Sequence, residues 1–175
     1  MLTVGDIMTT DVITISPEAT VRELAETLSD AHISGAPVVD SKRALVGVVS
    51  AADIVRFASE PPAPGSSPSW DSVLADAKPD YVPSFFQVSA NSWFDWSVIA
   101  DPAGGALDET KVKDLMTTVP FSVPAETSVS LLAQFLAERK IHRAIVTGPD
   151  GLLGIVTAFD VLQACSRLLG PTAEA

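Results

Sequence analysis

Two pairs of side chains in this sequence combine a hydroxyl with a carboxylate three residues later. Ser50 and Asp53 form one pair, and Thr157 and Asp160 form the other. Each pair lies between an apolar run and a segment with helical apolar spacing, so each should sit at the N-terminus of a helix. The free N–H groups there and a hydroxyl suit a phosphate, while a carboxylate can accept hydrogen bonds from vicinal ribose hydroxyls. The spacing therefore indicates a nucleotide site.

The same spacing also has a purely structural interpretation. Ser or Thr followed three residues later by an acidic side chain forms a capping box, which needs no ligand. Two features favour a ligand: Asp is shorter than the usual Glu or Gln, and Gly47 or Gly154 precedes each hydroxyl by three residues. Both interpretations stay open at the level of sequence.

The two pairs belong to a duplicated sequence. Residues 47–53 (Gly-Val-Val-Ser-Ala-Ala-Asp) return as residues 154–160 (Gly-Ile-Val-Thr-Ala-Phe-Asp), and residues 4–10 are echoed by residues 112–118. Self-similarity over a unit of roughly fifty residues is typical of a supersecondary unit that covers its apolar face by packing against a copy. Functional residues are therefore expected between the copies.

Each copy has the pattern strand, helix, strand, strand, helix. Thr20 and Glu23 predict a capping box at the start of the first helix. One apolar stripe follows in each copy, formed by Val21, Leu24, Ala25 and Leu28 in the first and by Val129, Leu132, Ala133 and Leu136 in the second. Polar turns at residues 40–43 and 148–151 predict a hairpin in each copy. The apolar positions of the final helices are Ile54, Val55 and Phe57 in the first copy and Val161, Leu162 and Cys165 in the second.

The chain divides into four expected parts. These are a first repeat (1–58), a Pro-rich linker with an aromatic insertion (59–111), a second repeat (112–168) and a C-terminal tail (169–175). The insertion holds a cluster of aromatic residues, which are Trp70, Tyr81, Phe85, Phe86, Trp93, Phe94 and Trp96. Because disordered segments are poor in aromatics, this part is expected to dock on its own repeats, on a partner or over the ligand cleft.

Composition excludes several classes of function. A net charge of −11 opposes nucleic-acid binding. The single cysteine, Cys165, has no partner in the chain, and no apolar run is long enough to span a bilayer, so we expect a cytoplasmic protein without membrane contact. The sequence shows no nucleophile with a base, no metal-ligand spacing and no phosphate-binding glycine loop, so it predicts neither an enzyme nor a metal site.

Several spaced motifs that recur twice in order resemble a pair of CBS domains, the module named after cystathionine β-synthase and also called a Bateman module. They are Asp-hydrophobic-Met at 6–8 and 114–116, hydrophobic-Pro-Val-Val at 36–39, and Gly-x-x-Ser/Thr-x-x-Asp at 47–53 and 154–160. The resemblance covers both copies and not the insertion. It implies an α/β (α+β) fold of two β-α-β-β-α repeats about a pseudo-two-fold axis, with two clefts that commonly receive adenosine-containing ligands. It also implies a disc-shaped homodimer.

The resemblance assigns site residues by position. Asp53 and Asp160 would hold ribose hydroxyls, and Ser50 and Thr157 would approach phosphate. The first cleft would further be lined by Thr14, Ile33, Ser34, Gly35 and Pro37. In the second copy the matching residues are Ile141, His142 and Arg143, similar to the His-Arg pair that meets phosphates in the nucleotide-sensing subunit of AMP-activated kinase.

The two copies differ at informative positions. His142 and Arg143 have no cationic counterpart at Ser34 and Gly35, so the clefts should not be equivalent, and one competent site is expected. Phe159 replaces the small residue found before Asp53 and could fill the second cleft or stack on a base.

Two functional hypotheses follow. In the first, the chain is a regulatory or sensor module that requires no cofactor. It binds AMP, ADP, ATP or S-adenosylmethionine between the repeats and so alters the affinity for a client protein, an allosteric effect. In the alternative, the clefts are empty, and the chain is a homodimerisation or interaction scaffold whose contact surface is the aromatic insertion, including Trp93 and Trp96.

Overall fold

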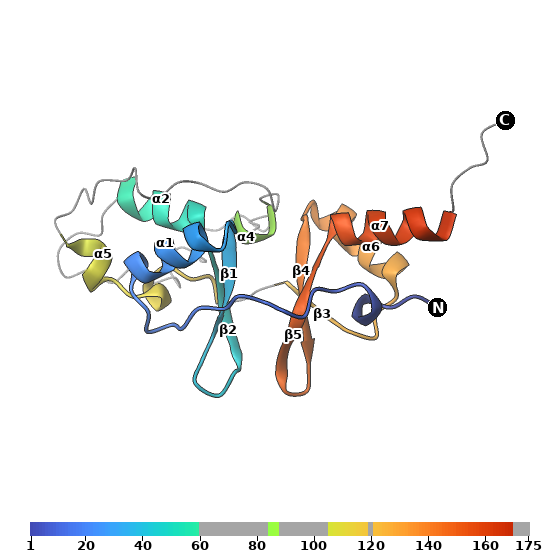
Figure 1. Ribbon diagram of the computed structural model, residues 1–175, viewed down its shortest axis with the longest axis horizontal. Coiled ribbons are helices and arrows are strands. Elements are labelled where there is room, and N and C mark those ends of the chain that lie inside the picture. Colours follow the sequence, from blue (N-terminus) through green and yellow to red (C-terminus); the bar gives the residue numbers. More distant parts are fainter. Residues whose placement is uncertain (60–83, 88–104, 119–120, 170–175) are drawn as a thin grey trace. The chain divides into compact units, whose positions relative to one another are not determined.

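The computed structural model describes residues 1–59, 84–87, 105–118 and 121–169 (Figure 1). The chain forms two compact units. The first-repeat unit is Ile13–Pro120, and the second-repeat unit joins Met1–Val12 to Phe121–Ala175. Each unit packs helices against a small sheet, so the predicted mixed α and β class is confirmed.

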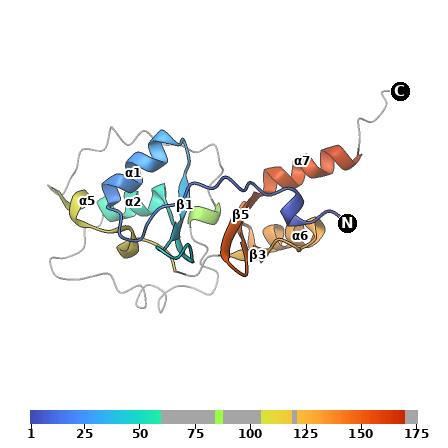
Figure 2. The ribbon, with the colours of Figure 1, turned by 60° about the horizontal axis from the view of Figure 1, so that its bottom comes forward.

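The first-repeat unit is built around one β-hairpin. Its elements are α1 (Val21–Asp30), β1 (Gly35–Val39), β2 (Leu45–Ser50), α2 (Ala51–Ser59), the short helices α4 (Ser84–Gln87) and α5 (Ala106–Glu109), and a 3₁₀ turn η3 (Val112–Asp114). The predicted capping box begins α1: the Thr20 N–H donates to Glu23 over 2.7 Å, and the Glu23 N–H donates to Thr20 over 3.1 Å. Helix α1 lies on one side of the hairpin and α4 on the other, as Figures 1 and 2 both show.

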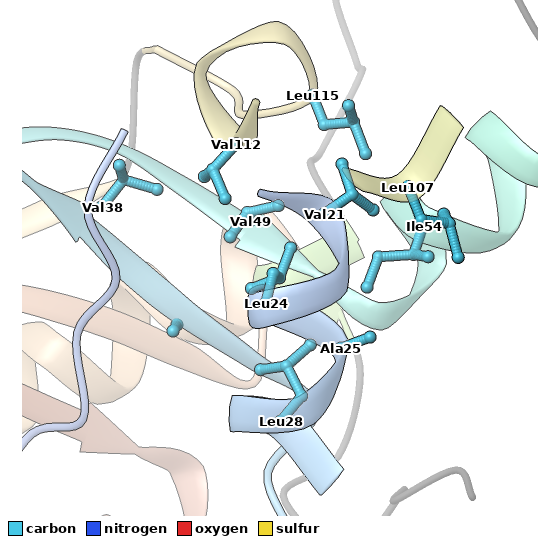
Figure 3. Packing of buried hydrophobic residues seen from close by; sticks show 11 residues of the cluster. Val21, Leu24, Ala25, Leu28, Val38, Val49, Ile54, Leu107, Val112 and Leu115 are labelled. Carbon is cyan, nitrogen blue, oxygen red and sulfur yellow. The ribbon is translucent and has the colours of Figure 1, made fainter. Parts of the chain in front are cut away.

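The core of this unit lies between α1 and one face of the hairpin (Figure 3). Its buried members are Val21, Leu24, Ala25, Leu28, Ala36, Val38, Val49, Ile54, Leu107, Val112 and Leu115. Because successive strand residues point to opposite faces, placing Ala36 and Val38 in the core turns Gly35 and Pro37 to the other face. That second face carries the candidate site.

The second-repeat unit repeats the helix, hairpin and final helix of the first and adds a third strand. It contains the 3₁₀ turn η1 (Val4–Asp6), β3 (Ser122–Pro124), α6 (Val129–Arg139), β4 (Arg143–Gly148), β5 (Gly151–Thr157) and α7 (Ala158–Leu169). Strand β3 pairs parallel to β4, which pairs antiparallel to β5. Three members of the predicted α6 stripe, Val129, Leu132 and Leu136, are buried, and Ala133 is half-buried.

The opening strand is shorter in the first repeat than the sequence predicts. In the second repeat the Ile145 N–H donates to the Phe121 carbonyl at 3.1 Å, and β3 forms. The matching residue in the first repeat is Pro37, which has no N–H to donate. Only an isolated bridge between Ile15 and Val38 remains there.

The opening segment of each sequence repeat packs in the unit of the other repeat. Thr9 bridges Ile155 of β5, and Thr117 bridges Val48 of β2. The Gly5 N–H also donates to the carbonyl of Ala125 at 2.8 Å. The ranges 1–58 and 112–168 therefore describe repeats of the sequence. In the structure, residues 1–12 belong to the second-repeat unit, and residues 112–118 belong to the first-repeat unit.

The final helices bury fewer apolar residues than expected. Ile54 and Val161 are buried, but Val55, Leu162 and Cys165 are exposed, because the following position on a helix points about 100° away from the core-facing one. Within the described ranges, no helix is long and apolar enough to cross a membrane.

Candidate ligand sites at the two Ser/Thr–Asp motifs

In the first repeat, Ser50 ends β2, and Asp53 lies in the first turn of α2. The Ser50 N–H and Oγ both donate to Asp53 Oδ2, each at 2.7 Å. The bond from the Ser50 N–H to the Asp53 side chain is one of the two bonds of a capping box, the structure that needs no ligand. Ser50 is fully buried, and Asp53 is 4% exposed.

Thr157 and Asp160 repeat this arrangement where β5 meets α7. The Thr157 N–H and Oγ1 donate to Asp160 Oδ2, each at 2.7 Å, and the Asp160 N–H donates back to Oγ1 at 3.2 Å. The box is thus complete in the second repeat. Both residues are half-buried, so this carboxylate is more accessible than that of Asp53.

Arg56 distinguishes the two carboxylates, although from the sequence it is expected to be an ordinary surface cation. Its Nη2 donates to Asp53 Oδ1 at 2.6 Å, an i, i+3 ion pair on α2. The equivalent residue of α7 is Gln163, and no described residue donates to Asp160 Oδ1. Spacing alone could have identified this pair, since residues three apart on a helix are neighbours.

Burial raises the pKa of Asp53, and this effect outweighs the lowering by the hydrogen bonds from Ser50 and the charge of Arg56. Both oxygens of this carboxylate already accept hydrogen bonds within the protein. A ligand at Asp53 would have to displace Arg56 or share its acceptor.

Four of the other predicted residues of the first site lie at the start of the hairpin or just before it, whereas Thr14 precedes α1. Gly35 pairs with Ser50 across the strands, and the Ala51 N–H donates to the Ser34 carbonyl at 2.9 Å. Ser34, Gly35 and Pro37 are buried, whereas Thr14 and Ile33 are half-buried. Ile33 packs against the core cluster. Ser34, Gly35, Ser50 and Asp53 thus come together at the junction of β1, β2 and α2.

In the second repeat, the cationic pair separates into one exposed and one buried side chain. His142 is exposed, and its carbonyl accepts from the Ala158 N–H at 2.8 Å. Arg143 is 7% exposed and pairs with Thr157 across the strands, so its side chain lies on the same face as the hydroxyl. Burial lowers the pKa of the Arg143 guanidinium, which still carries its charge at neutral pH. Ile141 is buried.

The aromatic residues singled out in the sequence differ in burial. Phe159 is 65% exposed, so its ring does not bury itself in the second repeat. Phe85 and Phe86 are buried in α4, which contacts β2 and α2, as expected for an insertion that docks on its own repeats. The remaining aromatic residues of the insertion lie outside the described residues; they are Trp70, Tyr81, Trp93, Phe94 and Trp96.

The glycine of each motif has a packing role. A Cβ on Gly47 would lie 2.7 Å from the Thr117 carbonyl oxygen, and one on Gly154 would lie 2.6 Å from the Thr9 carbonyl oxygen. Both distances are shorter than any Cβ tolerates, so each glycine admits an exchanged opening segment. These glycines are therefore not evidence for a ligand.

Among the described residues, no group of three or more His, Cys, Asp or Glu side chains is placed to hold a metal ion. The groups with chemistry to offer are the Thr157–Asp160 pair and the guanidinium of Arg143 on the same face. They supply an acceptor for hydroxyls and a cation for an anionic group, a combination suited to a sugar phosphate.

The CBS domain family model matches residues 4–60 and 112–167. The chain therefore belongs to the CBS domain family and carries the domain twice, as the tandem pair that the motifs predict.

Two curated relatives are the CBS domain-containing proteins CBSX1 and CBSX2 of Arabidopsis thaliana, both named as chloroplastic. The chain is 30% identical to CBSX1 over 172 residues and 28% identical to CBSX2 over 169 residues. The alignments cover 95% of this chain but only 65% and 64% of the relatives, so the chain spans slightly less than two thirds of their length.

The crystal structure of CBSX2 in complex with AMP superposes with a TM-score of 0.64 at 26% identity, covering 97% of this chain and 100% of that chain. An inosine-5′-monophosphate dehydrogenase of Bifidobacterium longum is 43% identical over 158 residues, which are 21% of its length. A match to so small a share of an enzyme carries none of its activity to this chain.

Proposed function

We propose that this chain is a regulatory module that binds an adenosine-containing ligand, with AMP as the best-supported member of the class, at the second-repeat site. The observation that carries the proposal is the half-buried Asp160 carboxylate, whose Oδ1 accepts no hydrogen bond from the described residues. A carboxylate held in place at one oxygen and open at the other suits vicinal hydroxyls. The AMP complex of CBSX2, a relative with the same tandem arrangement, supports the choice of ligand.

Three residues of the second-repeat site have distinct roles in ligand binding. Asp160 accepts hydrogen bonds from the ribose hydroxyls, Thr157 fixes the orientation of that carboxylate, and Arg143 pairs with the phosphate. Burial of the charged Arg143 guanidinium costs free energy and lowers its pKa. An ion pair with a phosphate would offset this cost. His142, which is exposed beside it, adds a second donor at the edge of the site.

Calorimetric titration of three proteins with AMP and with adenosine tests this proposal. Asp160→Asn should weaken both ligands by about tenfold to a hundredfold, because it removes the charge from a hydrogen bond to hydroxyls that both ligands share. Arg143→Gln should weaken AMP and leave adenosine unchanged, since only AMP has a phosphate. Asp150→Asn, in the exposed β4–β5 turn, is the matched control and should change neither.

The proposal fails if the unaltered chain gives no heat and no thermal shift at millimolar AMP. It also fails if Asp160→Asn binds as tightly as the unaltered chain. Ligand binding becomes regulatory only when two arrangements of the protein differ in affinity, so the partner affinity should change when AMP is present.

A second candidate function is a homodimeric scaffold without a ligand. The final helix α7 favours it, since Phe159 and Leu162, one turn apart, are each 65% exposed. Light scattering coupled to size exclusion should then give a dimer for the unaltered chain and a monomer for Leu162→Glu. A dimer that persists in this variant excludes α7 as its contact.

A further inference from the structure

Helix α4 carries the aromatic residues of the insertion (59–111) that the structure describes, and it packs on the first repeat. Phe85 is 1% exposed, and Phe86 is fully buried. Their rings meet edge to face, with centroids 5.0 Å apart and planes at 85°. These two side chains are among the largest fully buried ones of the described residues, so α4 is packed as part of the first-repeat unit.

Phe85 lies against Gly35, one of the residues predicted to line the base pocket of the first site. A Cβ on Gly35 would lie 2.8 Å from Cδ2 of Phe85, closer than Cβ atoms come to other atoms. It would also lie 3.1 Å from the Cα of Ser50, the hydroxyl residue of the motif. The same Cβ would lie 2.7 Å from the Val49 carbonyl oxygen, so the missing side chain at residue 35 allows both the close strand pairing and the contact with the ring.

The ring occupies the face of the hairpin that carries the candidate site. Ala36 and Val49 point into the core on the α1 side, so Gly35 and Ser50 point to the opposite side. Helix α4 lies on that opposite side in both views (Figures 1 and 2) and contacts β2 and α2. Burial of Ser34, Ser50 and Asp53 to 4% exposure or less agrees with a covered site.

The acceptors of this site are also used within the protein. Ser50 occupies Asp53 Oδ2, and Arg56 occupies Oδ1. The second repeat has Arg143 in place of Gly35 and Gln163 in place of Arg56, so it provides neither the space for a ring nor the cation at the carboxylate. The two residues that allow the first site to be closed, Gly35 and Arg56, thus have no equivalent in the second repeat.

We infer that α4 is a built-in occupant of the first-repeat site. The Phe85 ring takes the place of an aromatic base, Arg56 takes the place of the sugar hydroxyls at Asp53, and an adenosine-containing ligand binds this chain only at the second repeat. This inference rests on the proposed function and adds to it the number and location of bound ligands.

Stoichiometry measured by calorimetry with AMP tests the inference. The unaltered chain should bind one equivalent, with an affinity that Asp160→Asn weakens by about tenfold to a hundredfold and Asp53→Asn leaves unchanged. The double variant Phe85→Ala/Arg56→Gln should bind a second equivalent, and adding Asp53→Asn to it should remove that equivalent again. Leu131→Ala, at an exposed position of α6, is the control and should stay at one.

A measurement on the unaltered chain keeps the test decisive if the double variant does not fold. In an NMR titration with AMP, the amide signals of Thr157 and Asp160 should shift, and those of Ser50 and Asp53 should not. Two equivalents in the unaltered chain, or shifts at Ser50 and Asp53, overturn the occupant while leaving the proposed function intact. A folded double variant that still binds one equivalent also overturns it. Absence of binding in every protein removes the proposed function and this inference together.

Discussion

The Ser50–Asp53 and Thr157–Asp160 motifs have the same local geometry in different surroundings. In both, a backbone N–H and a hydroxyl donate to one carboxylate oxygen over 2.7 Å. In the first repeat Arg56 occupies the other oxygen, whereas in the second repeat no described residue donates to it. A duplicated motif can therefore keep the same local bonds in both copies while only one copy has a carboxylate oxygen without a described donor.

The largest expected effect is on the free energy of unfolding, and it tests whether α4 is packed firmly on the first repeat. Phe86→Ala should lower the free energy of unfolding by about 3–5 kcal/mol, because it removes a fully buried ring. Leu168→Ala, on the exposed side of α7, should change it by less than about 0.5 kcal/mol. Urea unfolding of both variants measures the difference. A loss below about 1 kcal/mol for Phe86→Ala would mean that α4 contributes little to the first repeat.

The next effect should be equal in the two repeats. Gly47→Ala and Gly154→Ala should each cost about 1–3 kcal/mol, because the new methyl group would collide with a backbone carbonyl of the exchanged segment. Gly148→Ala is the control, since its Cβ would meet only the side chain of Leu153, which can move. Thermal unfolding of the three variants would contradict the shared packing role if Gly47→Ala or Gly154→Ala were as stable as Gly148→Ala.

Helix starts provide a smaller contrast. Thr20→Ala should cost about 1 kcal/mol, because Thr20 and Glu23 satisfy each other's backbone N–H groups. Ser128→Ala should cost about 0.5 kcal/mol, because Ser128 accepts one longer bond, 3.3 Å from the Leu131 N–H, and residue 131 returns none. Chemical denaturation of both variants checks the order, and a larger loss for Ser128→Ala would reverse the argument.

The subtlest test is the dependence of stability on pH at Asp53. Burial raises the pKa of this carboxyl, so the folded state holds its proton to a higher pH than the unfolded state does. The stability contributed by the protonated form is complete below the unfolded pKa and is lost as the pH rises through the folded pKa. The free energy of unfolding of the unaltered chain, relative to Asp53→Asn, should therefore fall as the pH rises from about 4. A relative stability that grows with pH would show that the ion pair with Arg56 outweighs desolvation.

Much of the fold could be predicted from the sequence because it depends on local patterns. The capping box of Thr20 and Glu23 and the polar turns between the β-branched runs are short-range signals, and the elements form where they indicate. The shortened opening strand follows from Pro37, whose missing N–H is visible in the sequence, but its consequence depends on which strand lies beside it.

The site was less predictable because its differences arise from contacts between distant segments. The burial of Phe85 against Gly35 joins residues with no shared periodicity, and no local pattern predicts such a contact. The packing of Gly154 against Thr9 likewise depends on a segment distant in sequence, so the motif alone does not reveal that this glycine has a packing role. The pair of Asp53 with Arg56 is the exception, since helical spacing alone brings these residues together.

The exchange of opening segments has a consequence for how the chain is made. Met1–Val12 leaves the ribosome well before β5, the strand that this segment bridges through Thr9. The first-repeat unit can close once Thr117 has emerged, while Met1–Val12 has to wait until β5 is made. A gene cut midway between the repeats would give two polypeptides that each need the other to finish folding.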